Sequence, residues 1–98
     1  MVRDKEFPEW SVELPIDGTL DLHAFQPRDL GSLIPEYISE CHARGIYEIR
    51  IIHGKGQGKL QRSVHVLLDR IPEVEGYRLA DELRGGWGAT LVQLKFEL

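Results

Sequence analysis

The sequence predicts an α/β fold: a two-layer sandwich with two main helices on one face of a four-stranded mixed sheet. Its apolar residues alternate with a period of two in some segments and recur every three or four residues in others, in the order β-α-β-α-β-β. Each expected strand also has one apolar side and one polar side. Because two helices can cover only one side of such a sheet, the polar side is expected to face solvent.

Composition limits the classes of protein to which the chain can belong. Its 98 residues suit a single domain. Cys41 is the only cysteine, which excludes an intramolecular disulfide and favours a reducing compartment. There is no membrane-spanning apolar run and no signal-peptide pattern, so the expected location is cytoplasmic. The formal net charge of −4 means that any binding to nucleic acid would depend on a local basic patch.

The first strand is predicted from strict alternation over residues 19–23. On this half-buried strand, Asp21 and His23 share the polar side. Residues 1–17 show no regular period, and they are expected to form an arm outside a domain of residues 18–98.

The first helix is predicted to begin near Pro27, which suits a first turn, and to stop at Gly45. One apolar face with three- and four-residue spacing supports it, formed by Leu30, Leu33, Ile34, Tyr37, Ile38 and Cys41. Pro35 lies inside this segment and has no N–H group, so a kink or two short helices are expected there.

The second strand is predicted over residues 47–53, where β-branched and apolar residues alternate with charged ones. A loop with three glycines follows it. The second helix is predicted from about Lys59 to Ile71, with a core face of Leu60, Val64, Leu67, Leu68 and Ile71.

The rest of the sheet is predicted from two shorter segments. Residues 76–80 form the expected third strand, and residues 82–89 form a second glycine-rich loop. Residues 90–96 form the expected last strand, whose buried side would comprise Val92, Leu94 and Phe96.

A candidate site follows from this arrangement. A helix joins the first two strands, so they should be parallel, and their C-terminal ends should meet at one edge of the sheet. Asp21, His23, His53 and the glycine-rich loop from Gly54 to Gly58 all belong to that edge, where open α/β sheets bind ligands. The loop precedes a helix and can present free N–H groups to an anion. The plainer alternatives are a tight turn with a surface lysine and an ordinary polar strand side.

Three stretches resemble the signatures of the Smr (small MutS-related) domain family: Leu20-Asp21-Leu22-His23, His53-Gly54-Lys55-Gly56 and Gly85-Gly86-Trp87-Gly88-Ala89-Thr90. The resemblance covers roughly residues 18–96. It implies a two-layer fold akin to the C-terminal domain of translation initiation factor 3. It also implies nucleic-acid binding and, in many members, endonuclease activity on DNA or RNA. Nothing resembles a MutS ATPase or a pentatricopeptide array, so a stand-alone member is expected.

The chain departs from the family pattern at two positions. Ala24 stands where the family often has glycine after the first histidine, which implies a different loop before the first helix. Gln61 stands where an arginine is common, and the neighbouring Arg62 would have to supply that phosphate contact.

Candidate roles follow from what phosphodiester cleavage requires, namely a base, an acid and positive charge around the phosphate. The candidate catalytic residues are Asp21, His23, His53 and Lys55. The candidate residues for binding phosphate or nucleic acid are Gly54, Gly56, Gly58, Lys59, Arg62, Gly85, Gly86, Trp87, Gly88 and Thr90. Asp21 would orient an imidazole or, with His23, help to hold Mg²⁺ or Mn²⁺; the need for a metal stays open. His42 and His65 are expected to face solvent.

The predicted function is that of an endonuclease hydrolysing phosphodiester bonds in DNA or RNA. The alternative is a non-catalytic module that binds nucleic acid with the same loops. A third hypothesis is a protein-interaction domain that uses the open sheet face. The sequence leaves undecided whether DNA or RNA is the substrate, what structure is preferred, and which oligomeric state forms.

Overall fold

The computed structural model describes residues 15–56, 58–80 and 88–96. Its elements, in chain order, are β1 (Thr19–Asp21), η1 (Leu22–Ala24), η2 (Pro27–Asp29), α3 (Leu30–Ala43), β2 (Glu48–Ile52), α4 (Lys59–Asp69), β3 (Val74–Leu79) and β4 (Ala89–Leu94). The two η elements are short 3₁₀ turns.

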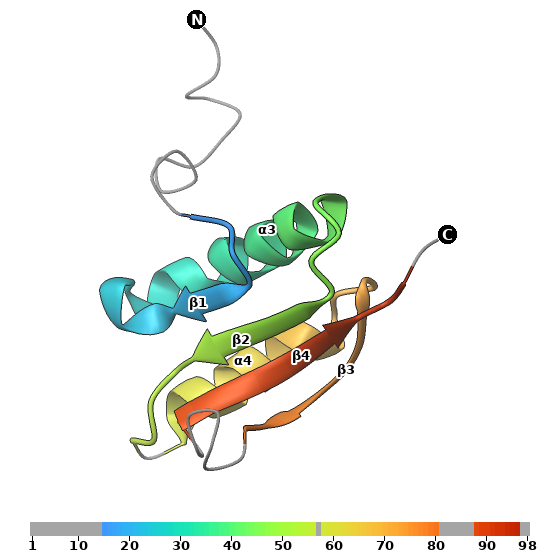
Figure 1. Ribbon diagram of the computed structural model, residues 1–98. Coiled ribbons are helices and arrows are strands. Elements are labelled where there is room, and N and C mark those ends of the chain that lie inside the picture. Colours follow the sequence, from blue (N-terminus) through green and yellow to red (C-terminus); the bar gives the residue numbers. More distant parts are fainter. Residues whose placement is uncertain (1–14, 57, 81–87, 97–98) are drawn as a thin grey trace, which may run out of the picture.

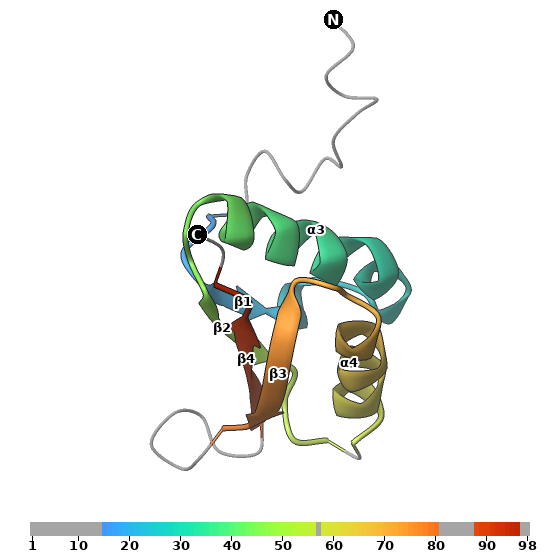
Figure 2. The same cartoon turned by 90° about the vertical axis from the view of Figure 1, so that its right-hand side faces the viewer.

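The four strands form one mixed sheet in the order β1-β2-β4-β3 (Figure 1). β1 and β2 are parallel, whereas β4 runs antiparallel to both of its neighbours. α3 and α4 lie on the same face of this sheet (Figure 2). The predicted two-layer α/β architecture is therefore confirmed, including the parallel pairing of the first two strands.

The core lies between the helices and the sheet. The six residues predicted for the apolar face of the first helix are all buried in α3. α4 contributes Val64 and Leu68, while Leu60 and Leu67 pack against the core from its border. Burying side chains of this size stabilises a fold by about 1.5–3 kcal/mol each, so these two amphipathic faces hold the helices on the sheet.

Tyr37 joins α3 to the start of β1. Its ring is fully buried, and its hydroxyl accepts a hydrogen bond from the Gly18 N–H at 3.0 Å and donates one to the Thr19 carbonyl at 3.2 Å. Burial raises the pKa of Tyr37 to about 12. The hydroxyl thus satisfies backbone groups that would otherwise be left without a partner at the sheet edge.

Pro35 does not divide the first helix. α3 continues through it from Leu30 to Ala43, so the expectation of two short helices is wrong. Pro35 removes one intrahelical hydrogen bond, whereas the buried residues on both sides of it lie on one continuous face. Packing of that face outweighs the missing bond.

The predicted first strand is two residues too long. β1 ends at Asp21, because the Asp21 carboxylate accepts the backbone N–H of His23 and turns the chain into η1. The last strand is also shorter than predicted, since β4 ends at Leu94. Phe96 lies beyond it and is 68% exposed, with its ring against Tyr47, so its predicted place in the core is wrong.

The domain boundary predicted at residue 18 stays a prediction. Residues 1–14 lie outside the described part of the chain, and the described Ile16 packs partly against the core. Within the described residues, no helix is long and apolar enough to cross a membrane.

Candidate functional site

Three segments that are far apart in the sequence meet at one edge of the sheet. β1 ends at Asp21 and β2 ends at Ile52, and these two residues are register partners. Ile52 is also the partner of Ala89, where β4 begins. The residues that follow β1 and β2 therefore lie side by side with Gly88, which precedes β4, at the edge that the sequence predicted for the first two strands.

Asp21 and His23 form a hydrogen-bonded pair on the surface. The Asp21 Oδ1 atom accepts from the backbone N–H of His23 at 2.9 Å and from its ring Nδ1 at 2.6 Å. These two bonds, the backbone one first, hold the pKa of Asp21 below its ordinary value. A carboxylate only accepts hydrogen bonds, so Nδ1 carries the proton and the Nε2 of a neutral His23 is left as an acceptor.

The imidazole of His23 lies over the glycine-rich loop. A Cβ atom placed on Gly54 would be 3.4 Å from His23 Nε2, so the imidazole lies directly beside this glycine. Gly88 ties the loop to β4, since its carbonyl accepts the N–H groups of both His53, at 2.9 Å, and Gly54, at 2.8 Å. The first two motifs and the described end of the third are therefore in contact.

The backbone of the loop repeatedly enters the left-handed region. Gly54, Gly56 and Gly58 have φ values of +84°, +36° and +84°. Gly58 is also the N-cap of α4, and no side chain caps that helix end. Alternating backbone conformations of this kind gather N–H groups into concavities that bind anions, and the uncapped N–H groups of α4 add to them.

His53, which was predicted as a catalytic residue, is buried. It is 5% exposed, and both ring nitrogens are engaged, Nδ1 with the Gly54 carbonyl at 2.8 Å and Nε2 with Thr90 Oγ1 at 2.8 Å. Thr90 is fully buried, so its predicted contact with nucleic acid does not fit the structure. Its hydroxyl instead joins two histidines, because His65 Nε2 lies 2.9 Å from the same oxygen.

His65 is the residue of this cluster that the sequence analysis missed. It was expected to face solvent, but it is half-buried between Thr90 and the ring of Tyr77. His65 lies three residues before the core residue Leu68 and so on the same side of α4. This spacing could have indicated that His65 is partly buried. His42 was also expected to face solvent; it bonds the Lys95 carbonyl and packs against Tyr47.

The hydrogen-bond directions in this cluster follow from the Gly54 carbonyl. A carbonyl only accepts, so His53 Nδ1 donates to it and the Nε2 of a neutral His53 accepts from the Thr90 hydroxyl. Thr90 Oγ1 is then free to accept from His65. In a trans peptide the C=O and the next N–H point in opposite directions, so the N–H of Lys55 points away from His53. The cluster thereby orients the loop.

Acid is expected to destabilise the domain through His65. Burial lowers the pKa of His65 from its ordinary 6.5, and the nearby His53 lowers it further, whereas Asp69 opposes this. Below about pH 6.5 the unfolded chain therefore binds more protons than the folded one, and the free energy of unfolding falls as the pH falls. Urea unfolding between pH 5 and pH 8 measures this slope. His65→Gln keeps the donor to Thr90 but cannot titrate, so an equally steep slope in that variant would contradict the assignment.

The remaining predicted residues divide into two groups. Lys55, Gly56, Lys59 and Arg62 are exposed along the loop and the start of α4. Gly85, Gly86 and Trp87 lie outside the described residues. Among residues 15–56, 58–80 and 88–96, no three His, Cys, Asp or Glu side chains gather as metal ligands, so Asp21 and His23 would need further donors to hold an ion.

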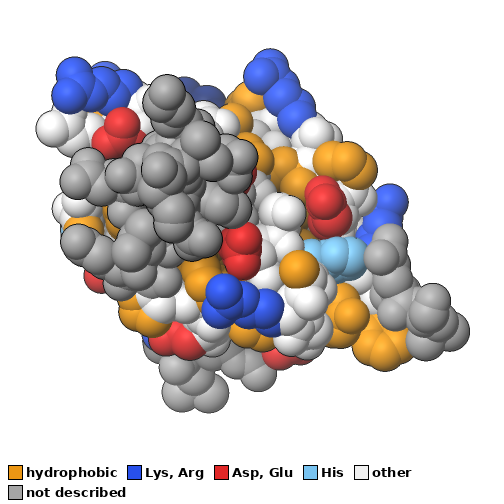
Figure 3. All heavy atoms as spheres, turned by 90° about the horizontal axis from the view of Figure 1, so that it is seen from above, with side chains coloured by type: hydrophobic (Ala, Val, Ile, Leu, Met, Phe, Trp, Pro, Cys, Tyr) orange, Lys and Arg blue, Asp and Glu red, His pale blue; other side chains and the backbone are white. Residues whose placement is uncertain are grey.

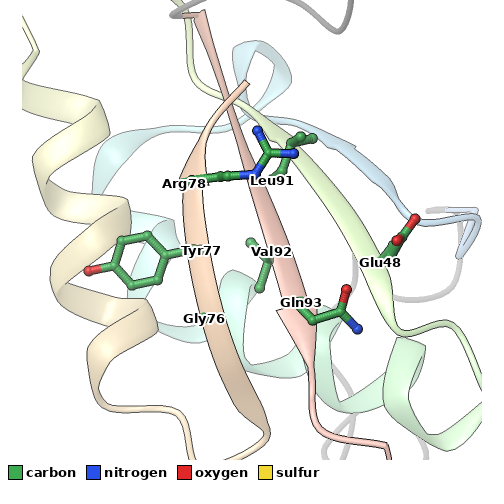
Figure 4. Close-up of a pocket in the computed structure, with 7 residues that line it drawn as sticks. All are labelled: Glu48, Gly76, Tyr77, Arg78, Leu91, Val92 and Gln93. Atoms are coloured by element: carbon green, nitrogen blue, oxygen red, sulfur yellow. The ribbon is translucent and has the colours of Figure 1, made fainter. Parts of the chain in front are cut away.

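Charged side chains of both signs occur on the face of the molecule seen from above in Figure 3. On the face seen in Figure 3, the described basic and acidic side chains are interspersed with apolar ones. A hollow of about 390 Å³ on the open sheet face holds Arg78 and also Glu48 (Figure 4). This hollow lies near the beginning of β2, whereas the Asp21–His23 pair lies at its end. It is therefore separate from the candidate site.

Comparison with known proteins identifies related chains. A family model described as the Smr domain matches residues 20–95. The Endonuclease MutS2 of Maridesulfovibrio salexigens is 40% identical over 91 residues, and that of Clostridium tetani is 35% identical over 80 residues. The alignments cover 93% and 82% of this chain but 11% and 10% of those relatives. The chain thus spans about a tenth of their length.

Two solved structures share the fold. The Smr domain of Thermus thermophilus MutS2 aligns with a TM-score of 0.74 and 29% identity, over 81% of this chain and 99% of that one. YdaL, a stand-alone small MutS-related protein from Escherichia coli, also gives a TM-score of 0.74, with 28% identity over 89% of this chain and 71% of that one. The family model, the sequence relatives and the shared fold agree, and the chain belongs to the Smr domain family.

Proposed function

We propose that this chain is an endonuclease that cleaves phosphodiester bonds in DNA or RNA within the cytoplasm. The observation that carries the proposal is the Asp21–His23 pair, whose accepting Nε2 faces a loop of left-handed glycines at a helix start. A proton acceptor and a phosphate cradle are thus neighbours. Similarity to proteins named Endonuclease MutS2 supports the proposal, although it extends over only a tenth of those proteins.

The chemistry assigned to the pair is general base catalysis. Asp21 holds the ring of His23 in one orientation and one tautomer, and Nε2 takes the proton of the attacking oxygen. Imidazole suits this task near neutral pH. The Lys55 ammonium and the loop N–H groups would stabilise the negative charge that develops on the phosphoryl oxygens. His53 and Thr90 act indirectly. Thr90 holds the ring of His53, and His53 holds the Gly54 carbonyl in a fixed direction.

A nuclease assay on matched DNA and RNA, each single-stranded and structured, tests the proposal. Cleavage of at least one substrate by the wild-type protein is expected, and parallel reactions with Mg²⁺, Mn²⁺ or a chelator define the metal requirement. A protein that binds these substrates but never cuts them would be a non-catalytic nucleic-acid-binding module instead.

Lys55→Ala is expected to weaken binding to every sequence and to flatten the dependence of affinity on salt. Lys55 is exposed on the loop, so its role would be that of a charge near phosphate. Losing one phosphate contact reduces the slope of log affinity against log salt by about 0.7–0.9. Fluorescence anisotropy at several salt concentrations measures both effects. Parallel salt lines for variant and wild type would contradict a phosphate contact at Lys55.

Gly56→Val is expected to weaken nucleic-acid binding while the domain stays folded. A Cβ on Gly56 meets nothing within 4 Å, so the substitution acts through its φ of +36°, which a β-branched residue adopts at a cost of about 1–3 kcal/mol. Gly45→Val is the matched control, because Gly45 has a φ of +76° and open space but follows α3, remote from the loop. Equal affinities of the two variants at matched salt would argue against the cradle.

A further inference from the structure

A groove of about 630 Å³ lies between the beginning of α3 and most of the length of α4. Gly31 and Leu30 form its wall on α3, and residues from Lys59 to Leu67 form its wall on α4. Both helices begin at the edge where β1 and β2 end, as Figure 1 shows. The groove therefore opens beside the glycine-rich loop, whose last residue is the N-cap of α4.

The groove is lined by basic side chains at one end and by apolar side chains elsewhere. Lys59 and Arg62 line it in the first turn of α4, and none of the described residues lining it is acidic. Leu30, Leu67 and Val66 supply the apolar surface. Val66 is 43% exposed and is one of only two large hydrophobic side chains that are exposed in the described part of the chain. An apolar strip bordered by cations is complementary to a nucleoside that carries phosphates.

The unusual feature of the α3 wall is Gly31. A glycine in the first turns of a helix lowers helix stability, yet this one has no positive φ that would require it. A Cβ there would meet nothing within 4 Å. The missing side chain instead leaves the groove open.

We propose that this groove seats one unpaired nucleoside of the nucleic-acid strand, next to the phosphate that the loop holds. The proposal rests on the proposed function, since the loop must hold that phosphate. An apolar surface contacts a base chiefly through its flat face, and in a duplex those faces are stacked on neighbouring base pairs. The substrate class is therefore a single-stranded or looped strand rather than a continuous duplex.

Gly31→Leu tests the groove without removing any interaction. The new side chain fills the groove, and leucine is a better helix former than glycine, so the domain is expected to stay folded. Ser39→Leu is the matched control, because Ser39 is exposed on α3 but does not line the groove. Val66→Glu is a second variant that places a negative charge among the side chains that line the groove.

The probes are a labelled 12-nucleotide single strand, its blunt duplex and inorganic pyrophosphate, the last measured by competition. Gly31→Leu and Val66→Glu are expected to weaken binding of the single strand about fivefold or more. Ser39→Leu should leave the affinity for the single strand unchanged. Gly31→Leu should leave the inhibition constant of pyrophosphate, measured by displacement of the labelled strand, unchanged. Wild-type protein should prefer the single strand to the duplex.

Three results would overturn the proposal. Single-strand affinity unchanged in Gly31→Leu but lowered in Lys55→Ala would leave the phosphate site standing and remove the nucleoside seat. Equal weakening for single strand and duplex would assign the groove to backbone contacts alone. A wild-type dimer in sedimentation that Gly31→Leu dissociates would make a second copy of the chain the occupant. Failure of the proposed endonuclease function is distinct, because wild-type protein would then cut no substrate, whereas its preference for the single strand and the effect of Gly31→Leu on binding would remain.

Discussion

Replacing His23 with alanine is expected to slow cleavage by about a hundredfold to ten-thousandfold, which is the usual contribution of a general base. Binding is expected to change little, because it depends on phosphate contacts at the loop and on α4 rather than on the imidazole. The side chain of His23 is 67% exposed, so its removal should not unfold the domain. Single-turnover cleavage and anisotropy on the same substrate separate rate from affinity.

Two further variants sharpen this experiment. Asp21→Asn should also slow cleavage, because an amide can donate to Nδ1 as well as accept from it and so no longer holds one tautomer. His42 lies near the C-terminal end of α3, whereas the Asp21–His23 pair precedes the beginning of this helix. His42→Ala therefore controls for the loss of an imidazole outside the candidate site. Loss of binding together with activity in His23→Ala would show that His23 positions the ligand and would refute its role as the base.

Thr90→Val is expected to destabilise the domain strongly although the side chain keeps nearly the same shape. Thr90 is fully buried, and its hydroxyl is the partner of both His53 and His65. Valine leaves Nε2 of the buried His53 without a partner, at a cost of about 1–3 kcal/mol, and it also removes the hydrogen-bond partner of the half-buried His65. In a domain of this size, each kcal/mol lowers the melting temperature by about 4–8 °C. Thermal unfolding measures the loss.

Thr90→Ser distinguishes the hydroxyl from the methyl group. It restores both hydrogen bonds and should recover most of the stability lost in Thr90→Val, whereas it leaves a small cavity. Affinity for phosphate is a second measurement. In Thr90→Val, His53 loses its partner and no longer fixes the direction of the Gly54 carbonyl, so phosphate affinity should fall. In Thr90→Ser, phosphate affinity should recover. Equal stabilities of the valine variant and the wild type would refute the cluster.

Much of the fold could be predicted because it depends on periodic burial. The apolar spacing on α3, from Leu30 to Cys41, and the alternation in β2 each extend over several residues. A single residue that departs from the pattern therefore does not prevent the helix or the strand from being predicted. Errors occurred at the ends of elements. β1 stops two residues early because one carboxylate binds one N–H group, and Phe96 leaves the core because β4 ends before it. A single local contact decides such ends, and periodicity carries no information about it.

The sequence by itself determined the two-layer fold and the edge of the sheet at which its first two motifs meet. A helix between two strands makes those strands parallel, and this brings Asp21, His23 and the glycine-rich loop together regardless of side-chain detail. Only the tertiary structure decided which histidines face solvent. His53 follows β2, Thr90 lies in β4 and His65 lies in α4. The buried Thr90 hydroxyl is the hydrogen-bond partner of both rings, which allows His53 to be buried and His65 to be half-buried. Local sequence patterns carry no information about hydrogen bonds between residues that are 25 or 37 positions apart. For this reason the sequence could not distinguish His53, which supports the loop, from His23, which faces the solvent.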